Sequence, residues 1–242
     1  MAQPIEWADY DAVLFDLDGV ITPTADVHER AWAELFRDYD YSADDYLTSI
    51  DGRPRYDGVR TFLATRGITL PEGSPDDPPG DDTVCALGNR KNELFNELLA
   101  REGIAPYPGS IAVLDALDVL GVPYAVVSSS KNARGVLEAA GLTARFPRVV
   151  DGVTAAQEHV AGKPEPDMFL LGASILDGAP ERSVVVEDAV SGVTAGHAGG
   201  FGLVIGVDRS GTNTDALREA GADIVVTDLA DTLAPSRDER SS

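Results

Sequence analysis

Residues 12–19 read Ala12-Val13-Leu14-Phe15-Asp16-Leu17-Asp18-Gly19, and this stretch decides the fold. Four apolar residues lead into two aspartates separated by one leucine, and a short apolar run predicts a parallel strand buried on both faces. Side chains alternate along a strand, so Asp16 and Asp18 would point the same way. They would lie at the carboxyl end of the strand, where open α/β sheets bind their ligands. A turn carrying exposed acids is the alternative, because Asp-Gly is a common turn dipeptide.

The composition of the 242-residue chain is that of a globular protein, with 43% hydrophobic and 25% charged residues. This length suffices for one large domain or two smaller ones. The net charge of −22 disfavours binding to nucleic acid or anionic membranes, and no apolar run approaches the ~20 residues of a membrane span. The first residues lack the features of a signal peptide, and the single Cys85 cannot form an internal disulfide. We therefore expect a cytoplasmic monomer that acts on a small molecule.

Arginine supplies nearly all of the positive charge, and the lysines are Lys91, Lys131 and Lys163. A lysine retained in a lysine-poor chain can serve as a compact point charge, a role that arginine does not fill. Chance retention on the surface is the alternative.

The segment from residue 24 to residue 105 predicts helices only. Apolar residues at helical spacing predict one helix over 25–37, a second ending near Thr65, and a third over 83–102. Residues 71–82 are rich in Pro, Asp and Gly and predict a mobile, solvated loop without chemistry. A helical segment placed directly after the first strand predicts a cap domain inserted into an α/β core.

Strands and helices alternate after residue 106. The apolar runs predict strands at 124–127, 149–150, 183–186, 203–207 and 224–226. This alternation is typical of a Rossmann-like parallel sheet. The predicted fold class is therefore α/β, with a core domain formed by residues 1–23 and 106–242 and a helical cap over 24–105. Within the core segment, residues 228–242 predict a polar tail.

Polar side chains follow the predicted strands or the turns beyond them, at Ser128 to Asn132, at Lys163 and at Glu187-Asp188. Because the carboxyl ends of parallel strands converge on one rim, we expect these groups beside the first aspartate pair. The serines before a helix suit an anion, although ordinary N-capping by one serine is the alternative. Oxygen ligands without His or Cys favour Mg²⁺ over zinc. A cation, a lysine and a carboxylate nucleophile are what phosphoryl transfer requires.

Two features of the helical segment predict a role in the site. His28 follows the aspartate pair closely and can reach a carboxylate near neutral pH, which favours a role in positioning Asp18. The turn from Asp51 to Val59 holds Arg53 and Arg55 at a helix start, and this chemistry suits a phosphate. Surface ion pairs with the neighbouring aspartates are the alternative.

These motifs, in this order along the chain, resemble those of the haloacid dehalogenase superfamily: Phe15 to Val20, Ser128, Lys163-Pro164 and Glu187-Asp188. The helical insertion is similar to the four-helix cap of that family. The resemblance is strongest to its β-phosphoglucomutase-like branch. It rests there on Phe15 to Ile21, His28 with Ala31-Trp32, Arg55, Arg90-Lys91-Asn92, Ser128 to Asn132 and Lys163-Pro164.

The resemblance implies roles for the residues of the rim. Asp16 would take the phosphoryl group as an aspartyl phosphate, and Asp18 would act as general acid and base. Ser128 and Lys163 would bind the transferring phosphoryl group. Mg²⁺ would be held by Asp16, the Asp18 carbonyl, Glu187 and Asp188.

The resemblance also implies where a substrate binds. Arg55, with Lys131 and Asn132 or Ser130, would hold the distal phosphate of a glucose bisphosphate intermediate. His28 and Lys91 would tie closure of the cap to Asp18. The complete predicted substrate-binding set is Gly19, His28, Gly52, Arg55, Lys91, Ser130, Lys131 and Asn132.

Three functions compete on these grounds. The first is a mutase that interconverts β-D-glucose 1-phosphate and glucose 6-phosphate, and the cap residues Arg55, His28 and Lys91 favour it. The second is a Mg²⁺-dependent sugar-phosphate phosphatase with the same Asp16 chemistry but with water as the acceptor. The third is a non-catalytic sugar-phosphate-binding protein. It is disfavoured because a protein that only binds an anionic ligand gains nothing from clustered negative charges.

Overall fold

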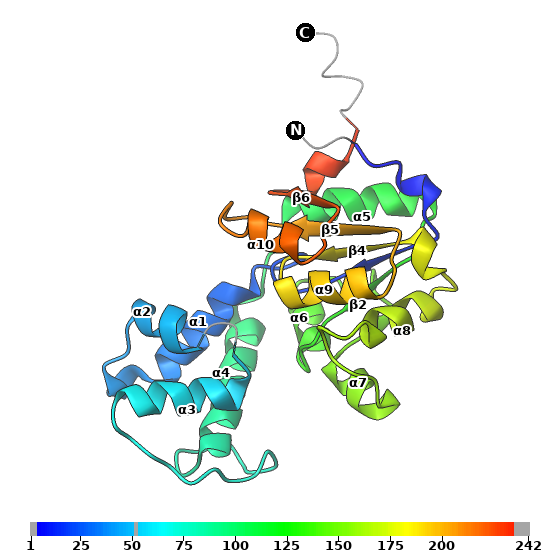
Figure 1. Cartoon of the computed structure of the whole chain (residues 1–242). Helices are drawn as coiled ribbons and strands as arrows, with labels where there is room; N and C mark the ends of the chain where they lie inside the picture. Colours follow the sequence, from blue (N-terminus) through cyan, green and yellow to red (C-terminus); the bar gives the residue numbers. More distant parts are fainter. Residues whose placement is uncertain (1–3, 51–52, 235–242) are drawn as a thin grey trace. The chain divides into compact units, whose positions relative to one another are not determined.

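The structure is a computed structural model that describes residues 4–50 and 53–234. The chain divides into two compact units, one formed by Met1–Pro23 with Ile104–Ser242 and the other by Thr24–Gly103 (Figure 1). The first is called the core unit and the second the helical unit. Among the described residues, no helix has both the length and the apolar character needed to cross a membrane.

A six-stranded, wholly parallel sheet forms the centre of the core unit. Its strands are β1 (Ala12–Phe15), β2 (Tyr124–Val127), β3 (Val149–Val150), β4 (Ser183–Glu187), β5 (Leu203–Val207) and β6 (Ile224–Val226). Their order is β3-β2-β1-β4-β5-β6, so β1 lies in the middle. All four β1 side chains are fully buried, as expected for a strand covered on both faces. The order of the strands reverses beside β1, which is where ligands bind in sheets of this kind.

Helices cover both faces of the sheet. The helices of the core unit are α5 (Pro108–Leu120), α6 (Ala133–Ala139), α7 (Gly152–Glu158), α8 (Asp167–Ile175), α9 (Val190–Ala198) and α10 (Thr214–Glu219), with the 3-10 turns η1 (Trp7–Asp9), η4 (Pro180–Arg182) and η5 (Leu229–Thr232). The chain runs from β1 to β3 in one direction and from β4 to β6 in the other. Right-handed crossovers therefore place α5 and α6 on one face and α8 to α10 on the other.

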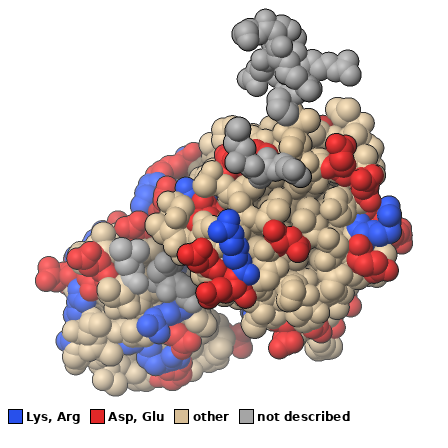
Figure 2. Space-filling view, turned by 45° about the horizontal axis from the view of Figure 1, so that its top comes forward, with Lys and Arg blue, Asp and Glu red and all other residues tan. Residues whose placement is uncertain are grey.

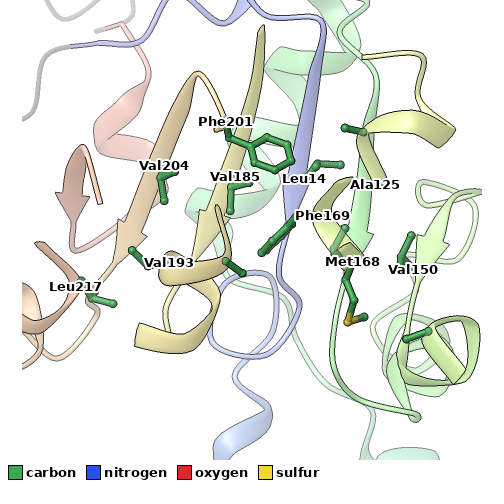
Figure 3. Packing of buried hydrophobic residues seen from close by; sticks show 14 residues of the cluster. Leu14, Ala125, Val150, Met168, Phe169, Val185, Val193, Phe201, Val204 and Leu217 are labelled. Carbon is green, nitrogen blue, oxygen red and sulfur yellow. The ribbon is translucent and has the colours of Figure 1, made fainter. Parts of the chain in front are cut away.

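The face covered by α8, α9 and α10 carries a continuous apolar core (Figure 3). Leu14 of β1 and Val185 of β4 pack there against Phe169 of α8, and all three side chains are fully buried. The ring of Phe169 meets that of Phe201 edge to face, with centroids 6.1 Å apart. This packing holds the central strands rigidly, so the residues that follow them have fixed starting points.

The helical unit has its own apolar core. Its elements are α1 (Thr24–Leu35), η2 (Arg37–Tyr39), α2 (Ala43–Asp45), the π-helical turn η3 (Tyr46–Ile50), α3 (Arg55–Thr65) and α4 (Val84–Glu102). Aromatic rings from separate elements stack at its centre, with the Phe36 and Phe62 centroids 4.0 Å apart. Of the four helices expected here, one is thus reduced to the short α2 followed by the η3 turn. That this unit acts as a cap stays a prediction.

The predicted strands agree closely with the structure. The ranges 124–127, 149–150, 203–207 and 224–226 are reproduced, and the α/β fold class is confirmed. The predicted polar tail is wrong at its start, because residues 229–232 form η5 with Leu229 and Thr232 fully buried. Ile5 donates its backbone N–H to the Thr232 carbonyl, which ties this turn to the beginning of the chain.

The loop at residues 71–82 is held by more contacts than its composition predicts. Asn89 of α4 donates through Nδ2 to the carbonyl oxygens of Pro75 and Asp77, and the Thr83 hydroxyl donates to the Asp77 carboxylate. Arg60 pairs with Glu72 at 2.7 Å. The loop is therefore fastened at several points to α3 and α4.

Acidic side chains are spread over the surface in view, with fewer basic ones among them (Figure 2). The net charge of −22 makes the compact state repel itself, and salt screens such repulsion. We expect the apparent Tm to rise by several degrees between about 0.1 M and 1 M KCl, since the Debye length falls from ~10 Å to ~3 Å. Differential scanning fluorimetry measures this shift, and an unchanged or lower Tm at 1 M KCl would contradict it.

Candidate active site

Asp16 begins the site at the carboxyl end of β1. Its backbone N–H donates to the Val186 carbonyl of β4, so the register of the sheet sets its position. Its carboxylate is mostly buried and accepts a hydrogen bond from Lys163 Nζ through Oδ1 at 2.6 Å. A buried carboxylate with a single strong cation beside it is held in one orientation.

Lys163 joins three strands at this rim. Its Nζ donates to Asp16 Oδ1, to Glu187 Oε1 at 2.8 Å and to the Val127 carbonyl at 2.9 Å. The ammonium also lies 4.6 Å from the centroid of the Phe169 ring, a favourable position for a cation. Its three donors are thus directed at β1, β2 and β4, and its two carboxylate partners raise the pKa of the lysine despite its burial.

Glu187 ends β4 and lies under the start of α9. Its Oε2 accepts the backbone N–H of Ala189 at 2.7 Å, while Oε1 accepts from Lys163. Gly192 makes this possible, because a Cβ there would lie 1.7 Å from Glu187 Oε1. The glycine of helix α9 therefore provides the space that this carboxylate occupies.

Asp188 contacts the turn that follows the aspartate pair. A Cβ at Gly19 would lie 1.8 Å from Asp188 Oδ2, and Gly19 also has a φ of +78°. Two separate constraints thus require glycine at position 19. Burial, followed by repulsion from the carboxylates of Glu187, Asp16 and Asp18, raises the pKa of Asp188 to about 9.

Asp18 lies in a tight turn of residues 17–22. The Ile21 and Thr22 N–H groups donate to the Leu17 carbonyl, and the Gly19 N–H donates to the Thr22 carbonyl at 2.8 Å. This turn is closed by its own backbone. Burial also raises the pKa of Asp16, with Glu187 and Asp18 acting in the same direction and Lys163 opposing them. The rim therefore holds more negative charge than Lys163 alone balances.

Ser128 follows β2 on the opposite side of Asp16 from β4. Its hydroxyl oxygen accepts the Ser130 N–H at 3.1 Å, and the Ser130 hydroxyl accepts the Asn132 N–H at 3.1 Å. The Ser128 proton is thus available for a further acceptor. Lys131 is exposed and lies against Gly152, where a Cβ would come within 3.1 Å of its Cγ.

Arg55 opens α3 in the helical unit and is bound by neutral amides. Its Nη2 donates to Asn92 Oδ1 at 2.9 Å and its Nη1 to Asn89 Oδ1 at 3.5 Å. The structure, within residues 4–50 and 53–234, gives this guanidinium no carboxylate partner. Its burial lowers the pKa of the arginine, so desolvation of the charge is only partly compensated. A guanidinium in these surroundings can bind an anion, and the predicted phosphate-binding role of Arg55 stays a prediction.

His28 and Lys91 form a second polar cluster in the helical unit. Lys91 Nζ donates to His28 Nδ1, and the ring of His28 stacks on Phe95 with centroids 4.2 Å apart. Lys91 is buried and lies 5.3 Å from the Trp32 ring centroid. Burial, Lys91 and Arg55 lower the pKa of His28 to about 3, so the imidazole is neutral at pH 7. Because Nδ1 accepts from Lys91, the His28 proton lies on Nε2.

The profile of haloacid dehalogenase-like hydrolases matches residues 10–200 of the chain. The chain belongs to this family. The β-phosphoglucomutases of Mycobacterium bovis and Mycobacterium tuberculosis are each 48% identical over 239 residues, covering 92% of this chain and 91% of theirs. Hexitol phosphatase A of Escherichia coli is 35% identical over 193 residues, covering 79% of this chain and 80% of its own. The crystal structure of β-phosphoglucomutase from Clostridium difficile superposes with a TM-score of 0.69 at 25% identity, covering 92% of each chain. This haloacid dehalogenase-like protein is therefore a phosphoryl-transfer enzyme.

The residues of this phosphoryl-transfer enzyme can supply oxygen ligands for a hard cation. Within residues 4–50 and 53–234, no three His, Cys, Asp or Glu side chains are grouped as a ready metal site. The carboxylates of Asp16 and Asp188 and the Asp18 carbonyl are nevertheless oxygen donors of the kind that Mg²⁺ prefers, and Mg²⁺ usually takes few protein carboxylates and keeps several waters. That these three groups bind the cation stays a prediction. Burial, followed by repulsion from the neighbouring carboxylates, raises the pKa of Asp188, and a bound cation would favour its charged form against both effects.

Glu187 was also predicted as a metal ligand. Both of its oxygens already accept hydrogen bonds, from Lys163 and from Ala189. Each carboxylate oxygen has a second lone pair, so the metal-binding role of Glu187 stays a prediction.

The predicted set divides between the two units. Asp16, Asp18, Gly19, Ser128, Ser130, Lys131, Asn132, Lys163, Glu187 and Asp188 lie in the core unit. His28, Arg55 and Lys91 lie in the helical unit, whereas Gly52 falls outside the described residues. Three groups that contact site residues were not predicted from the sequence: the Val127 carbonyl and the Phe169 ring beside Lys163, and the guanidinium of Arg209 beside Gly19. Arg209 lies two residues beyond β5. The rule that locates ligand sites at the carboxyl ends of strands could have indicated Arg209.

Proposed function

We propose that this chain is a β-phosphoglucomutase that interconverts β-D-glucose 1-phosphate and glucose 6-phosphate through an aspartyl phosphate and a glucose 1,6-bisphosphate intermediate. The observation that carries the proposal is the chemistry of Arg55, a partly buried guanidinium that is held by Asn89 and Asn92 and that pairs with no carboxylate among the residues the structure describes. A bisphosphate needs a second anion site besides the one at Asp16, and a phosphatase for monoesters does not. The 48% identity to two β-phosphoglucomutases supports the same function.

The proposed reaction begins at Asp16. One carboxylate oxygen forms a bond to a phosphorus of glucose 1,6-bisphosphate as the bond from that phosphorus to the sugar oxygen breaks. This leaves an aspartyl phosphate and a glucose monophosphate, whose sugar oxygen receives a proton from Asp18. Lys163 and the Ser128 hydroxyl stabilise the charge on the phosphoryl oxygens. In the second transfer, Asp18 accepts a proton from the free hydroxyl of a bound glucose monophosphate. The oxygen of that hydroxyl attacks the phosphorus as the bond from phosphorus to Asp16 breaks, which yields glucose 1,6-bisphosphate and restores the carboxylate. Mg²⁺, held by Asp16, Asp188 and the Asp18 carbonyl, would supply charge neutralisation of the phosphoryl group.

His28 has a proposed role in this proton transfer. Because Nδ1 accepts from Lys91 and the ring is neutral, Nε2 is a donor suited to the carboxylate of Asp18. In the proposed closed enzyme, the helical unit excludes water so that the aspartyl phosphate passes to the sugar instead of being hydrolysed.

A sugar-phosphate phosphatase is the second candidate, and the similarity to hexitol phosphatase A favours it. The test is incubation with β-D-glucose 1-phosphate, Mg²⁺ and a trace of the 1,6-bisphosphate, with glucose 6-phosphate and free phosphate both measured. The mutase yields glucose 6-phosphate with little phosphate. Stoichiometric phosphate release identifies the phosphatase instead, and absence of both products identifies a binding protein.

An Arg55→Lys variant sharpens this test. Lysine keeps the charge but cannot bond both amides with a planar fork. For the mutase, we expect a higher KM for the bisphosphate and a larger share of free phosphate among the products. Arg60→Lys is the matched control, because Arg60 lies on the same helix and pairs with surface acids. Equal behaviour of the two variants argues against a second anion site at Arg55.

Mg²⁺ is expected to stabilise the protein more at high pH. The pKa of Asp188 is raised from 3.8 to about 9 in the folded protein. An acid with a raised pKa favours folding below its unfolded pKa and loses this contribution as the pH rises, so the metal-free protein weakens between pH 4 and pH 9. Saturating Mg²⁺ at ~100 Kd adds about 2.7 kcal/mol, or roughly 5–10 °C in Tm.

Scanning fluorimetry at pH 6 and pH 8.5, with and without Mg²⁺, measures this effect. Protons compete with the cation for Asp188 at pH 6, so the Tm shift should be larger at pH 8.5. Asp188→Asn is expected to lose most of the shift at both values. A shift independent of pH, or retained in the variant, would exclude Asp188 as a ligand.

A further inference from the structure

Arg209 lies just beyond the carboxyl end of β5, and its side chain is only 19% exposed. Its Nε donates to the Gly19 carbonyl and its Nη2 to the Val20 carbonyl, both at 2.9 Å. These are the two residues that directly follow Asp18. A single guanidinium thus binds consecutive carbonyl groups of the turn that carries the proposed acid and base.

Other contacts hold the guanidinium itself. Its Nη2 also donates to the Ser110 hydroxyl at 3.2 Å, and its Nη1 lies 3.3 Å from Asp228 Oδ2. The guanidinium carbon lies 3.4 Å from the centroid of the Tyr107 ring, so the planar group is stacked on it. The guanidinium is therefore fixed from the side of α5 and from the turn before η5.

Ser110 and Tyr107, at the start of α5, also bond directly to the turn of residues 17–22. The Ser110 hydroxyl donates to the Val20 carbonyl at 2.6 Å, and the Tyr107 N–H donates to the Ile21 carbonyl at 2.9 Å. The carbonyls of residues 19, 20 and 21 are thus all held from outside the turn. Arg209 is the group that binds the first two together.

The partly buried guanidinium of Arg209 bonds mainly to neutral groups. Two of its strongest bonds go to neutral carbonyls, and the ion pair with Asp228 is its longest polar contact. Removing a charge from water costs free energy, and neutral acceptors compensate this cost less than a carboxylate would. The planar fork of the guanidinium matches two adjacent carbonyl oxygens, which the single ammonium group of a lysine cannot do. We infer that these contacts serve to fix the geometry of the turn at residues 19–21 more than to stabilise the fold.

We propose that Arg209 is a positioning residue for Asp18. By fixing the carbonyls of Gly19 and Val20, it sets the direction in which the preceding residue presents its carboxylate and its own carbonyl. The inference rests on the proposed function, in which both groups of Asp18 are used. Gly19 also lies against Asp188, where a Cβ would be 1.8 Å from Oδ2, so a shifted turn would disturb that contact as well.

Arg209→Lys tests the proposal, since it keeps the charge and removes the fork. We expect kcat to fall by roughly 10–100-fold, the effect typical of groups that orient active-site ligands, while KM for the sugar phosphate stays close to that of the wild type. Arg182→Lys is the matched control, because Arg182 binds Asp11 and the Asp9 carbonyl at the opposite end of β1. We expect kcat of the control to remain that of the wild type.

Hydrogen exchange of the metal-free protein gives a readout independent of turnover. In Arg209→Lys, peptides covering residues 17–22 should exchange faster, while those covering β4 and α8 should not change. Asp228→Asn retains the fork and loses the ion pair, so its kcat should stay within about fivefold of the wild type. Exchange that rises equally throughout the core unit, or unchanged exchange in residues 17–22, would overturn the proposal.

The two proposals fail in different ways. If the wild type converts β-D-glucose 1-phosphate neither to glucose 6-phosphate nor to free phosphate, the proposed function is excluded. The hydrogen-exchange comparison still decides whether Arg209 holds the turn of residues 17–22. An active wild type with an unaffected Arg209→Lys variant removes only the role of Arg209.

Discussion

Replacing Asp16 with asparagine should abolish phosphoryl transfer, with kcat reduced by at least about 10³-fold. Asparagine has almost the same shape but no carboxylate oxygen to attack phosphorus. The folded state should tolerate it, because burial already raises the pKa of Asp16 and so favours an uncharged group at this position. Formation of glucose 6-phosphate and release of free phosphate are both measured, since mutase and phosphatase share this nucleophile.

Asp11→Asn is the matched control for this experiment. Asp11 lies at the other end of β1, where its carboxylate pairs with Arg182 at 2.9 Å on the surface. Both variants remove one negative charge. A loss of activity in Asp16→Asn but not in Asp11→Asn is therefore due to the missing nucleophile and not to the change in net charge. Incubation with labelled substrate should also leave labelled protein only where Asp16 is present. Surviving turnover in Asp16→Asn refutes the assignment of the nucleophile.

Replacing Lys163 with methionine should lower the free energy of unfolding by about 3–5 kcal/mol near pH 8 in the metal-free protein. Methionine fills similar space but leaves the carboxylates of Asp16 and Glu187 without the cation that bonds both. The pKa of Lys163 is raised in the folded state, so its contribution is complete below the unfolded pKa near 10.5 and is lost as the pH rises beyond it. The deficit of the variant should shrink as the pH falls, because the Asp16 carboxylate, whose pKa burial raises, then takes up a proton.

Urea unfolding of the metal-free protein measures this loss. Arg148→Met is the control, because it removes one positive charge from an exposed position. The double variant Lys163→Met/Glu187→Gln should recover part of the stability, since one of the two orphaned charges is gone. A Lys163 variant as stable as the Arg148 control would show that the bonds between Lys163, Asp16 and Glu187 do not contribute to stability.

Local patterns carried most of the information about the elements. The strand at 203–207 could be placed because a run of apolar residues buried on both faces needs no partner to be recognised. The helix predicted over 83–102 was placed equally well, because it corresponds to α4 (Val84–Glu102) with Thr83 as its N-cap. By contrast, the buried turn at Leu229 was predicted as polar tail, because four residues carry too little periodicity to reveal what they pack against.

The composition of the candidate site was also predictable, but its bonding was not. Polar residues at the ends of strands could be assigned to one rim from the parallel topology alone. The sequence did not indicate that Lys163 bonds Asp16, 147 positions away, together with Glu187 and the Val127 carbonyl. Nor did it indicate Arg209, whose partners at Gly19 and Val20 are 190 and 189 positions away.

The sequence by itself determined the α/β class, the strands and the acids that follow them, because hydrophobic periodicity and turn chemistry act over a few residues. Only the tertiary structure decided which donor meets which acceptor: Lys163 with Asp16 and Glu187, Arg55 with two asparagines, and Arg209 with the turn after Asp18. These pairings depend on strand order, register and the space left at Gly19 and Gly192, to within a fraction of an ångström. Such distances arise only when segments far apart in the chain pack together.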